Sequence, residues 1–336
     1  MQKLLHFIFV LFFISTASFV HSQTREAYIA DSSIHLTGDG GYDYVFIDQE
    51  NQTLYASHGT IVNVVDLKTR KQIGIIKDMQ GVHGIAVVAK LHRGFITDGR
   101  ANAIVAFDTK SLKKLATIQV NAKGPDAITY DPFSNRIFSF NGESNNSSVI
   151  DPLTMKQIAT IELNGAPEFA VPDGKGKIFN NLEDKNSLNI IDTKTLKVIS
   201  NFPLAPCGGP TGIAYDKDNQ RIFTVCRQNK GMSIVNAHSG QVICTVPIGS
   251  GVDAVAFDED TKLIFCSNGD GTTSIYHQDT PDSYSLVQTL KTQFRAKTLA
   301  LDIKSHKIYL SVAGIASGAH KTIPGSFKIM VFKPNK

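Results

Sequence analysis

Short apolar, strand-like runs recur along the chain, and most of them end in an aspartate that begins a polar turn. Asp126–Asp131 and Thr211–Asp216 show the pattern clearly. Successive runs begin 40, 43, 42, 43, 42 and 44 residues apart, at Asp43, His83, Asp126, Glu168, Thr211, Asp253 and Lys297. The 3.6-residue spacing of helical arrays is absent, and a repeat near 42 residues made of strands is typical of propeller blades.

Each unit contains four strands. The first run leads into a turn, such as Asp131–Arg136, whose leading aspartate can accept hydrogen bonds from the backbone ahead of it. A second strand, a polar loop and a third strand follow, and a fourth strand such as Leu115–Ile118 completes the unit. Since seven such units fill the chain from Asp43 onward, the sequence predicts an all-β fold, a seven-bladed β-propeller with four antiparallel strands per blade.

The side-chain sizes of the first strand support this geometry. Small residues such as Gly84 and Ala86 occupy one face of that strand, and Ile85 and Val87 occupy the other. Blades taper towards the central axis, so the innermost strand needs one small face that can pack closely.

The ends of the repeat region predict how the ring closes. The seventh unit stops at Phe327–Phe332 and lacks a fourth strand, whereas Ala27–Leu36 precedes the first unit and has no other partner. We expect this N-terminal strand to complete the last blade.

Several segments resemble the YVTN-repeat β-propeller family of secreted bacterial proteins: Gly124–Pro132, Ile137–Gly142, Ile190–Lys197 and Ile264–Gly269. The resemblance covers essentially the whole mature chain and is weakest in the seventh unit. It implies a propeller that serves as a binding module, an envelope protein or a domain of a larger enzyme. The absence of tryptophan argues against WD-repeat and quinoprotein propellers, whose blades carry tryptophan-bearing motifs.

The first 22 residues have the pattern of a cleavable secretory signal. Lys3 precedes the apolar stretch Leu4–Ile14, and we expect cleavage after Ser22. A membrane anchor is the alternative, but the stretch is shorter than the ~20 residues that a span needs. We therefore expect residues 1–22 to be removed and residues 23–336 to form a single propeller domain of a periplasmic or secreted protein, with no membrane span in the mature chain.

Export places the four cysteines in a compartment where disulfides persist. Cys207 precedes the first strand of the fifth unit and Cys226 ends its second strand, so we expect these two cysteines to pair. Cys244 and Cys266 fall inside strands, and we expect them to be buried thiols.

Composition and charge narrow the function only slightly. The chain is 42% hydrophobic and 19% charged, with a formal net charge of +4 over 336 residues. That charge is too dilute to favour nucleic acid or an anionic membrane as a partner. We expect a monomer whose partner is a small ligand, an envelope polymer or a protein.

Propeller geometry brings the seven strand starts together at one mouth of the central channel. These seven residues form an inner ring, and four of them are acidic. The ends of the second strands form an outer ring on the same face: His58, Asp98, Asn141, Glu183, Arg227 and Asn268. From both rings we predict a ligand-binding set of Asp43, His83, Asp126, Glu168, Asp253, Asn141 and Asn268.

A divalent metal ion is the one candidate cofactor. Two imidazoles and two carboxylates on neighbouring blades are ligand types that zinc and other transition metals accept: His58, His83, Asp98 and Asp126. The alternative is that these side chains only cap loops and bond neighbouring backbone. The long loop of the seventh unit, Ala313–Ser326, could fold over the mouth and bring His320 with it, or it could be a plain surface excursion.

Motifs for a definite chemistry are absent from the sequence. It contains no G-x-S-x-G, H-E-x-x-H, P-loop or C-x-x-C, and Asp258-x-Asp260 starts a calcium-loop pattern that no glutamate completes. We therefore assign no catalytic residues and favour a binding or scaffold module that acts through the loop-rich channel-mouth face. The alternative is a metal-dependent hydrolase similar to calcium-dependent lactonases, with a cation held at the mouth by these carboxylates and amides.

Overall fold

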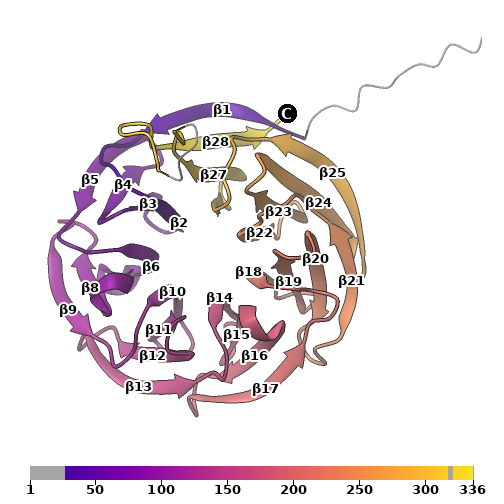
Figure 1. Ribbon diagram of the computed structural model, residues 1–336, viewed down its shortest axis with the longest axis horizontal. Coiled ribbons are helices and arrows are strands. Elements are labelled where there is room, and N and C mark those ends of the chain that lie inside the picture. The colour runs from indigo at the N-terminus through magenta and orange to yellow at the C-terminus, as the bar shows by residue number, and fades with distance from the viewer. Residues whose placement is uncertain (1–26, 317–320, 336) are drawn as a thin grey trace, which may run out of the picture.

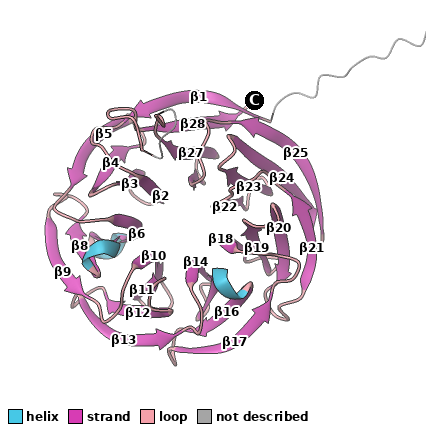
Figure 2. Cartoon of the chain, viewed as in Figure 1, coloured by secondary structure: helices cyan, strands magenta, loops and turns pink. Residues whose placement is uncertain are grey.

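Seven four-stranded antiparallel sheets form a ring around a central axis (Figure 1). The computed structural model describes residues 27–316 and 321–335, so the expected signal segment 1–22 and His320 lie outside the described residues. Strands dominate the described chain, and short 3₁₀ turns occur in its loops (Figure 2): η1 (Ala89–Leu91), η2 (Gly99–Ala101) and η3 (Glu183–Lys185). The prediction of an all-β, seven-bladed propeller is confirmed.

The first six blades each use four strands that follow one another in sequence, from the channel outward. Blades one to three consist of β2 (Tyr42–Asp48), β3 (Thr53–His58), β4 (Ile61–Asp66) and β5 (Lys71–Ile76); β6 (Val82–Val88), β7 (Arg93–Asp98), β8 (Ala103–Asp108) and β9 (Lys114–Gln119); and β10 (Pro125–Asp131), β11 (Arg136–Asn141), β12 (Asn146–Asp151) and β13 (Lys156–Glu162).

Blades four to six repeat the arrangement. They consist of β14 (Pro167–Pro172), β15 (Lys177–Leu182), β16 (Ser187–Asp192) and β17 (Lys197–Pro203); β18 (Pro210–Asp216), β19 (Arg221–Cys226), β20 (Gly231–Asn236) and β21 (Val242–Pro247); and β22 (Ala254–Asp258), β23 (Leu263–Asn268), β24 (Thr272–Thr280) and β25 (Ser283–Lys291).

The seventh blade joins the two ends of the described chain. Its sheet runs β26 (Leu299–Asp302), β27 (Lys307–Val312), β28 (Lys328–Pro334) and then β1 (Tyr28–His35), which pairs antiparallel with β28. Figure 1 shows the indigo β1 beside the yellow β28. The N-terminal strand therefore completes the last blade, as the sequence predicts.

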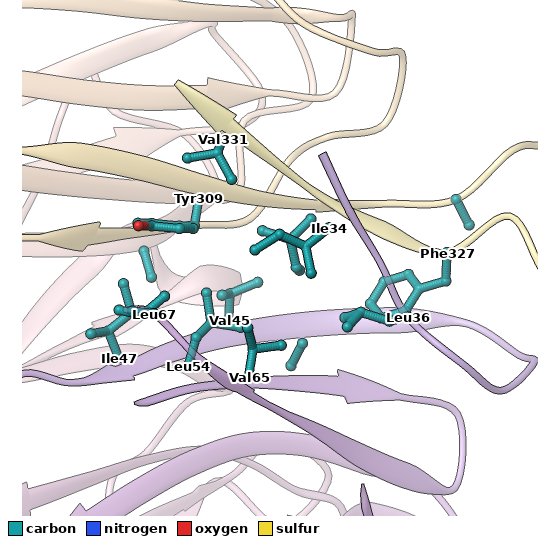
Figure 3. Close-up of a cluster of buried hydrophobic side chains, with 14 residues drawn as sticks. Ile34, Leu36, Val45, Ile47, Leu54, Val65, Leu67, Tyr309, Phe327 and Val331 are labelled. Atoms are coloured by element: carbon teal, nitrogen blue, oxygen red, sulfur yellow. The ribbon is translucent and has the colours of Figure 1, made fainter. Parts of the chain in front are cut away.

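Apolar side chains fill the space between neighbouring blades. Between blades seven and one, Ile34 of β1 and Val331 of β28 pack with Leu54 and Val65 of blade one (Figure 3). On the other side of blade seven, the Tyr28 ring makes an edge contact with Phe265 of blade six, with 5.0 Å between ring centroids. The closing strand thus contributes to the cores on both sides of its blade.

The innermost strands approach one another closely where the sequence has glycine. A Cβ atom added at Gly84 would lie 2.7 Å from the carbonyl oxygen of Asp126, and one added at Gly212 would lie 2.8 Å from that of Asp253. The small face predicted for the first strands is therefore required by backbone packing near the axis.

Hydroxyl groups from the blades fix the backbone at the start of several inner strands. Thr97 Oγ1 donates to the carbonyl of Asp126 at 2.6 Å, and Thr298 Oγ1 donates to the carbonyl of Asp43 at 2.6 Å. Ser267 Oγ bonds the carbonyl of Lys297 in the same way. These bonds position the side chains at the channel mouth.

The structure also tests the predictions for the turns and the cysteines. Asp131 and Asp216 accept backbone N–H bonds within their turns, and Asp258 does the same from Asp260, in agreement with a turn instead of a calcium loop. Cys207 and Cys226 form a disulfide. Cys266 is a buried free thiol, as expected, but Cys244 is only half-buried, because it lies in β21, the outermost strand of its blade. No helix in the described ranges is long and apolar enough to cross a membrane.

Candidate functional site

Three neighbouring inner strands bring an imidazole and two carboxylates together at the channel mouth. Asp43 lies in β2, His83 in β6 and Asp126 in β10, which are adjacent in the ring (Figure 1). His83 Nδ1 lies 2.8 Å from Asp43 Oδ2 and 3.6 Å from Asp126 Oδ1. All three side chains are partly exposed, so this cluster, the mouth trio, faces the opening.

A second charged cluster lies across the ring from the mouth trio. Asp253 is buried, and its two oxygens bond Arg227 and Lys297, the latter at 2.5 Å. Arg227 also bonds Glu183 Oε1 at 2.7 Å. Both cations are therefore committed to carboxylates.

Crowding of carboxylates changes their ionisation. Burial, which contributes most, the nearby Asp126 charge and a hydrogen bond with Glu183 together raise the pKa of Glu168 to about 9. Burial and the Asp43 charge raise the pKa of Asp126 to about 7, although His83 opposes the shift. The hydrogen bond to Asp43 raises the pKa of His83 against the effect of burial.

Two aromatic rings from opposite sides of the channel close it beneath the charged groups. Tyr44 of blade one stacks on Phe169 of blade four, with 4.6 Å between ring centroids. Tyr44 Oη and Asp126 Oδ1 are buried and have no hydrogen-bond partner among the described residues. Burial, followed by the charges of Asp126 and Asp43, raises the pKa of the Tyr44 hydroxyl. The mouth is thus a cup with an aromatic floor.

A pocket of about 360 Å³ adjoins the mouth trio between blades one and two. Its lining includes Asp43 and His83, the backbone of a glycine-rich turn, and the Arg100 side chain at its edge. The long loop of blade seven reaches this turn, because Thr322 Oγ1 donates to the carbonyl of Gly40 and the Gly325 amide donates to Asp39. The described part of that loop therefore lies beside the mouth, and His320, which the first alternative brings over it, lies outside the described residues.

Four residues of the predicted site have other roles. The His58 ring lies on Phe327, with 4.0 Å between ring centroids, and the Asp98 carboxylate accepts the amides of Gln80 and Gly81. Two further side chains are buried and bond hydroxyl or amide groups within their own blades: Asn141 and Asn268. The structure therefore joins His83 and Asp126 to Asp43, and it does not add His58 or Asp98 to that cluster.

Three functional features were missed by the sequence analysis. Arg227 belongs to the predicted outer ring, but its side chain reaches inward to Asp253. Tyr44 and Phe169 come directly after Asp43 and Glu168, the first residues of their repeat runs. In the other runs this position carries Gly, Ala or Thr: Gly84, Ala127, Gly212, Ala254 and Thr298. Two aromatic residues in a column of small ones were a signal that something large enters the channel there.

Comparison with solved structures supports the propeller fold. A chain of Kuenenia stuttgartiensis hydrazine synthase is similar, with a TM-score of 0.72 and 17% sequence identity over 82% of this chain and 94% of that chain. At this identity the likeness shows the fold alone. No family model and no curated protein matches the sequence, so membership of the YVTN-repeat family stays a prediction. The fold is one that commonly serves as a binding or scaffold module.

Proposed function

We propose that this protein is an exported binding module that holds a cation or a cationic small ligand in the cup at the channel mouth. One observation carries the proposal: Tyr44 Oη at the floor of the cup and Asp126 Oδ1 in the mouth trio are buried, and neither atom has a hydrogen-bond partner among the described residues. Buried polar atoms are nearly always bonded, and each one left unpaired costs about 1–3 kcal/mol. A ligand seated in the cup would remove that cost.

The charge of the cup favours a cationic ligand. Five carboxyl groups meet there with three basic side chains, Arg227, Lys297 and His83, and crowding raises the pKa of two of the five. The five are Asp43, Asp126, Glu168, Glu183 and Asp253. Converging carboxylates at a narrow, partly desolvated opening raise the local affinity for positive charge. Protonation of some carboxyl groups relieves only part of the repulsion among them, and a bound cationic group would neutralise the rest.

Binding is a better account than the hydrolase alternative. That alternative uses the amide oxygens of Asn141 and Asn268 as ligands, but Asn141 Oδ1 accepts from Ser139, and both amide groups are fixed by bonds to side chains of their own blades. The remaining groups of the cup offer charge and hydrogen bonds, which are sufficient for recognition.

Export and family membership belong to the same proposal. They are supported by the signal-like residues 1–22, by the YVTN-like segments and by the Cys207–Cys226 disulfide, a bond typical of oxidising compartments. The partner is then a small ligand or an envelope component that carries positive charge.

A substitution that fills the pocket tests the proposal. Gly41 lines the pocket, and a Cβ added there meets no atom within 4 Å, so Gly41→Trp can place a large ring in it without backbone clash. Gly142 offers a matched control on the same face, because its nearest contact would be 4.0 Å away. We expect Gly142→Trp to behave as the parent.

Thermal-shift screening of polyamines, amino sugars, cationic peptides and divalent metal salts gives the readout. Ligands that raise the melting temperature of the parent and of Gly142→Trp should lose most of that effect in Gly41→Trp or in Asp126→Asn. The proposal is wrong if every stabilising compound acts equally on all four proteins, or if no compound of these classes stabilises the parent.

A further inference from the structure

We propose that Asp43, His83 and Asp126 form a binding site for a divalent transition-metal cation such as Zn²⁺ or Mn²⁺. This inference rests on the proposed function, because it names the cation that the cup holds. The ligand atoms would be His83 Nδ1 and one carboxylate oxygen from each aspartate.

The distances within the mouth trio suit one metal ion. One ligand atom from each of the three side chains can be chosen so that all lie within 4.8 Å of one another. Metal–ligand bonds of about 2.0–2.2 Å place neighbouring ligands about 3–4 Å apart, so only small rotations of these side chains are needed. His83 Nδ1, now 2.8 Å from Asp43 Oδ2, would turn its lone pair to the metal.

The charges of the mouth trio match a divalent ion. With both aspartates ionised and the imidazole neutral, the mouth trio would present two negative charges to the ion, and binding would displace the protons that the raised pKa values of His83 and Asp126 favour. Two cationic side chains of the cup, Lys297 and Arg227, are already paired with Asp253. A divalent cation would therefore take the place of the His83 proton as the partner of both carboxylates.

Two polar atoms that have no hydrogen-bond partner among the described residues, one of them outside the trio, are a second indication of a ligand. Asp126 Oδ1 is buried without a hydrogen bond, and it is the Asp126 oxygen that faces His83. The unpaired hydroxyl of Tyr44 lies among the same carboxylates, where it could bond a metal-bound water. Such orphaned atoms in a polar cup point to an occupant that bonds oxygen.

The donor set selects the kind of metal. Calcium takes six to eight oxygen ligands, whereas one imidazole with two carboxylates is typical of zinc and manganese sites. Since the three side chains are partly exposed, the remaining coordination positions face the pocket and stay open to water or to a further ligand. The hydroxyls of Thr97 and Thr298 donate to the backbone carbonyls of Asp126 and Asp43, and these bonds hold two of the ligand residues in place.

The described chain contains a second cluster of this type on the opposite face, and it provides the matched control. Asp258, Asp260 and His306 also lie within ligand distance of one another. However, one oxygen of Asp258 accepts backbone amides of its turn, and the other lies 2.7 Å from His306 Nδ1. Asp258 is therefore committed to the turn and to the contact between blades six and seven.

The test is titration calorimetry of tag-free mature protein with ZnCl₂, MnCl₂ and CaCl₂ as the only probes. We expect one Zn²⁺ or Mn²⁺ per chain and weaker Ca²⁺ binding. Both His83→Ala and Asp126→Asn should lower transition-metal affinity about tenfold or more, while His306→Ala should leave it unchanged. Circular dichroism confirms folding, and Asp126→Asn is nearly isosteric, so the test stands if His83→Ala does not fold.

Three results would overturn the inference: no transition-metal binding by the parent, equal affinity in Asp126→Asn, or loss of binding in His306→Ala alone. A spectroscopic readout is available in addition, because Co²⁺ bound through His83 should lose its visible absorption band in His83→Ala. If the organic cations of the screen bind in the cup and metals do not, the metal inference falls and the proposed function stands. If metals and organic cations both fail, the proposed function falls as well.

Discussion

Glu168 and Asp253 face the same channel mouth but meet opposite surroundings. Asp253 is held by two cations, Arg227 and Lys297. Glu168 is largely removed from solvent and lies near other carboxylates, and these two effects together raise its pKa to about 9. One side of the mouth therefore keeps fixed charge pairs, and the other side holds a carboxyl group that retains its proton at neutral pH.

This difference predicts a pH-dependent effect of Glu168→Gln. In the unfolded chain a glutamate ionises near pH ~4.3, whereas in the folded protein Glu168 keeps its proton up to about pH 9. The folded state therefore binds more protons over that range, and Glu168 lowers stability progressively as pH rises through it. We expect the variant to be more stable than the parent by at least about 1 kcal/mol at pH 8, with little difference at pH 4.5.

Urea unfolding at both pH values measures this effect. Glu162→Gln, at an exposed position of β13, is the control and should change stability equally little at either pH. Equal free energies of unfolding for the parent and Glu168→Gln at pH 8 would show that Glu168 ionises normally.

Single residues also show where sequence reasoning ends. The repeat places Asp43, His83 and Asp126 at equivalent positions of neighbouring blades, so their proximity follows from the period alone. The direction of a long side chain does not follow from it. Arg227 turns inward because Asp253 offers a buried carboxylate, and His58 turns onto Phe327 because an apolar ring lies beside it.

At the scale of elements, the outermost strand of every blade carries a β-bulge at the same place. The pairing with the third strand shifts by one residue there, which leaves one extra residue in the outermost strand. Six of the seven bulge residues are apolar, and five of these are exposed: Ile73, Leu115, Ile158, Ile199 and Val287, with Ile243 half-buried. The seventh is Asp31 of β1.

Asp31, at the bulge of the closing blade, is the centre of an ion-pair network. Its carboxylate bonds Lys307 of β27 and Lys333 of β28, and it pairs with Arg70 of blade one at 2.8 Å. Burial tends to raise the pKa of Asp31, but the bonds to the two lysines and the Arg70 charge outweigh it and lower the pKa. The network thus ties β1 to its own sheet and to the next blade.

We expect Asp31→Asn to destabilise the protein by about 1 kcal/mol at pH 7. Since the folded-state pKa of Asp31 is lowered, its contribution is present above the unfolded-state value and is lost as pH falls through the folded-state value. The difference from the parent should therefore shrink in strongly acidic solution. Ile158→Asn, at the same bulge position of blade three, is the control and should have a small effect on stability that does not vary with pH. Urea unfolding of both variants at several pH values measures the difference, and a pH-independent loss in Asp31→Asn would contradict the prediction.

For the whole molecule, the decisive feature is that the ring is closed by strands from the two ends of the repeat region. This closure was predictable, because the seventh unit lacks one strand and one strand precedes the first unit. The aromatic floor was not, because Tyr44 and Phe169 meet across the channel from blades whose mutual position depends on the closed ring. A period gives the number of blades and the residues of each mouth, but contacts across the axis require three-dimensional packing.

Closure by β1 predicts that truncation at the N-terminal end destabilises the protein far more than truncation at the C-terminal end. Starting the mature chain at residue 36 removes β1, and with it the buried side chains of Tyr28 and Ile34 and the Asp31 network. Loss of two buried side chains alone costs several kcal/mol, at about 2–5 kcal/mol for each large residue, and β28 becomes an unpaired edge. We expect this variant to unfold at much lower urea concentration and to self-associate through β28.

Removing residues 335–336 instead breaks the backbone bond from Asn335 to Ala27 and leaves β1 paired, so it should change stability by less than about 1 kcal/mol. Urea unfolding and analytical ultracentrifugation compare the two truncations with the parent, and equal stability of the shortened N-terminal variant as a monomer would contradict closure by β1.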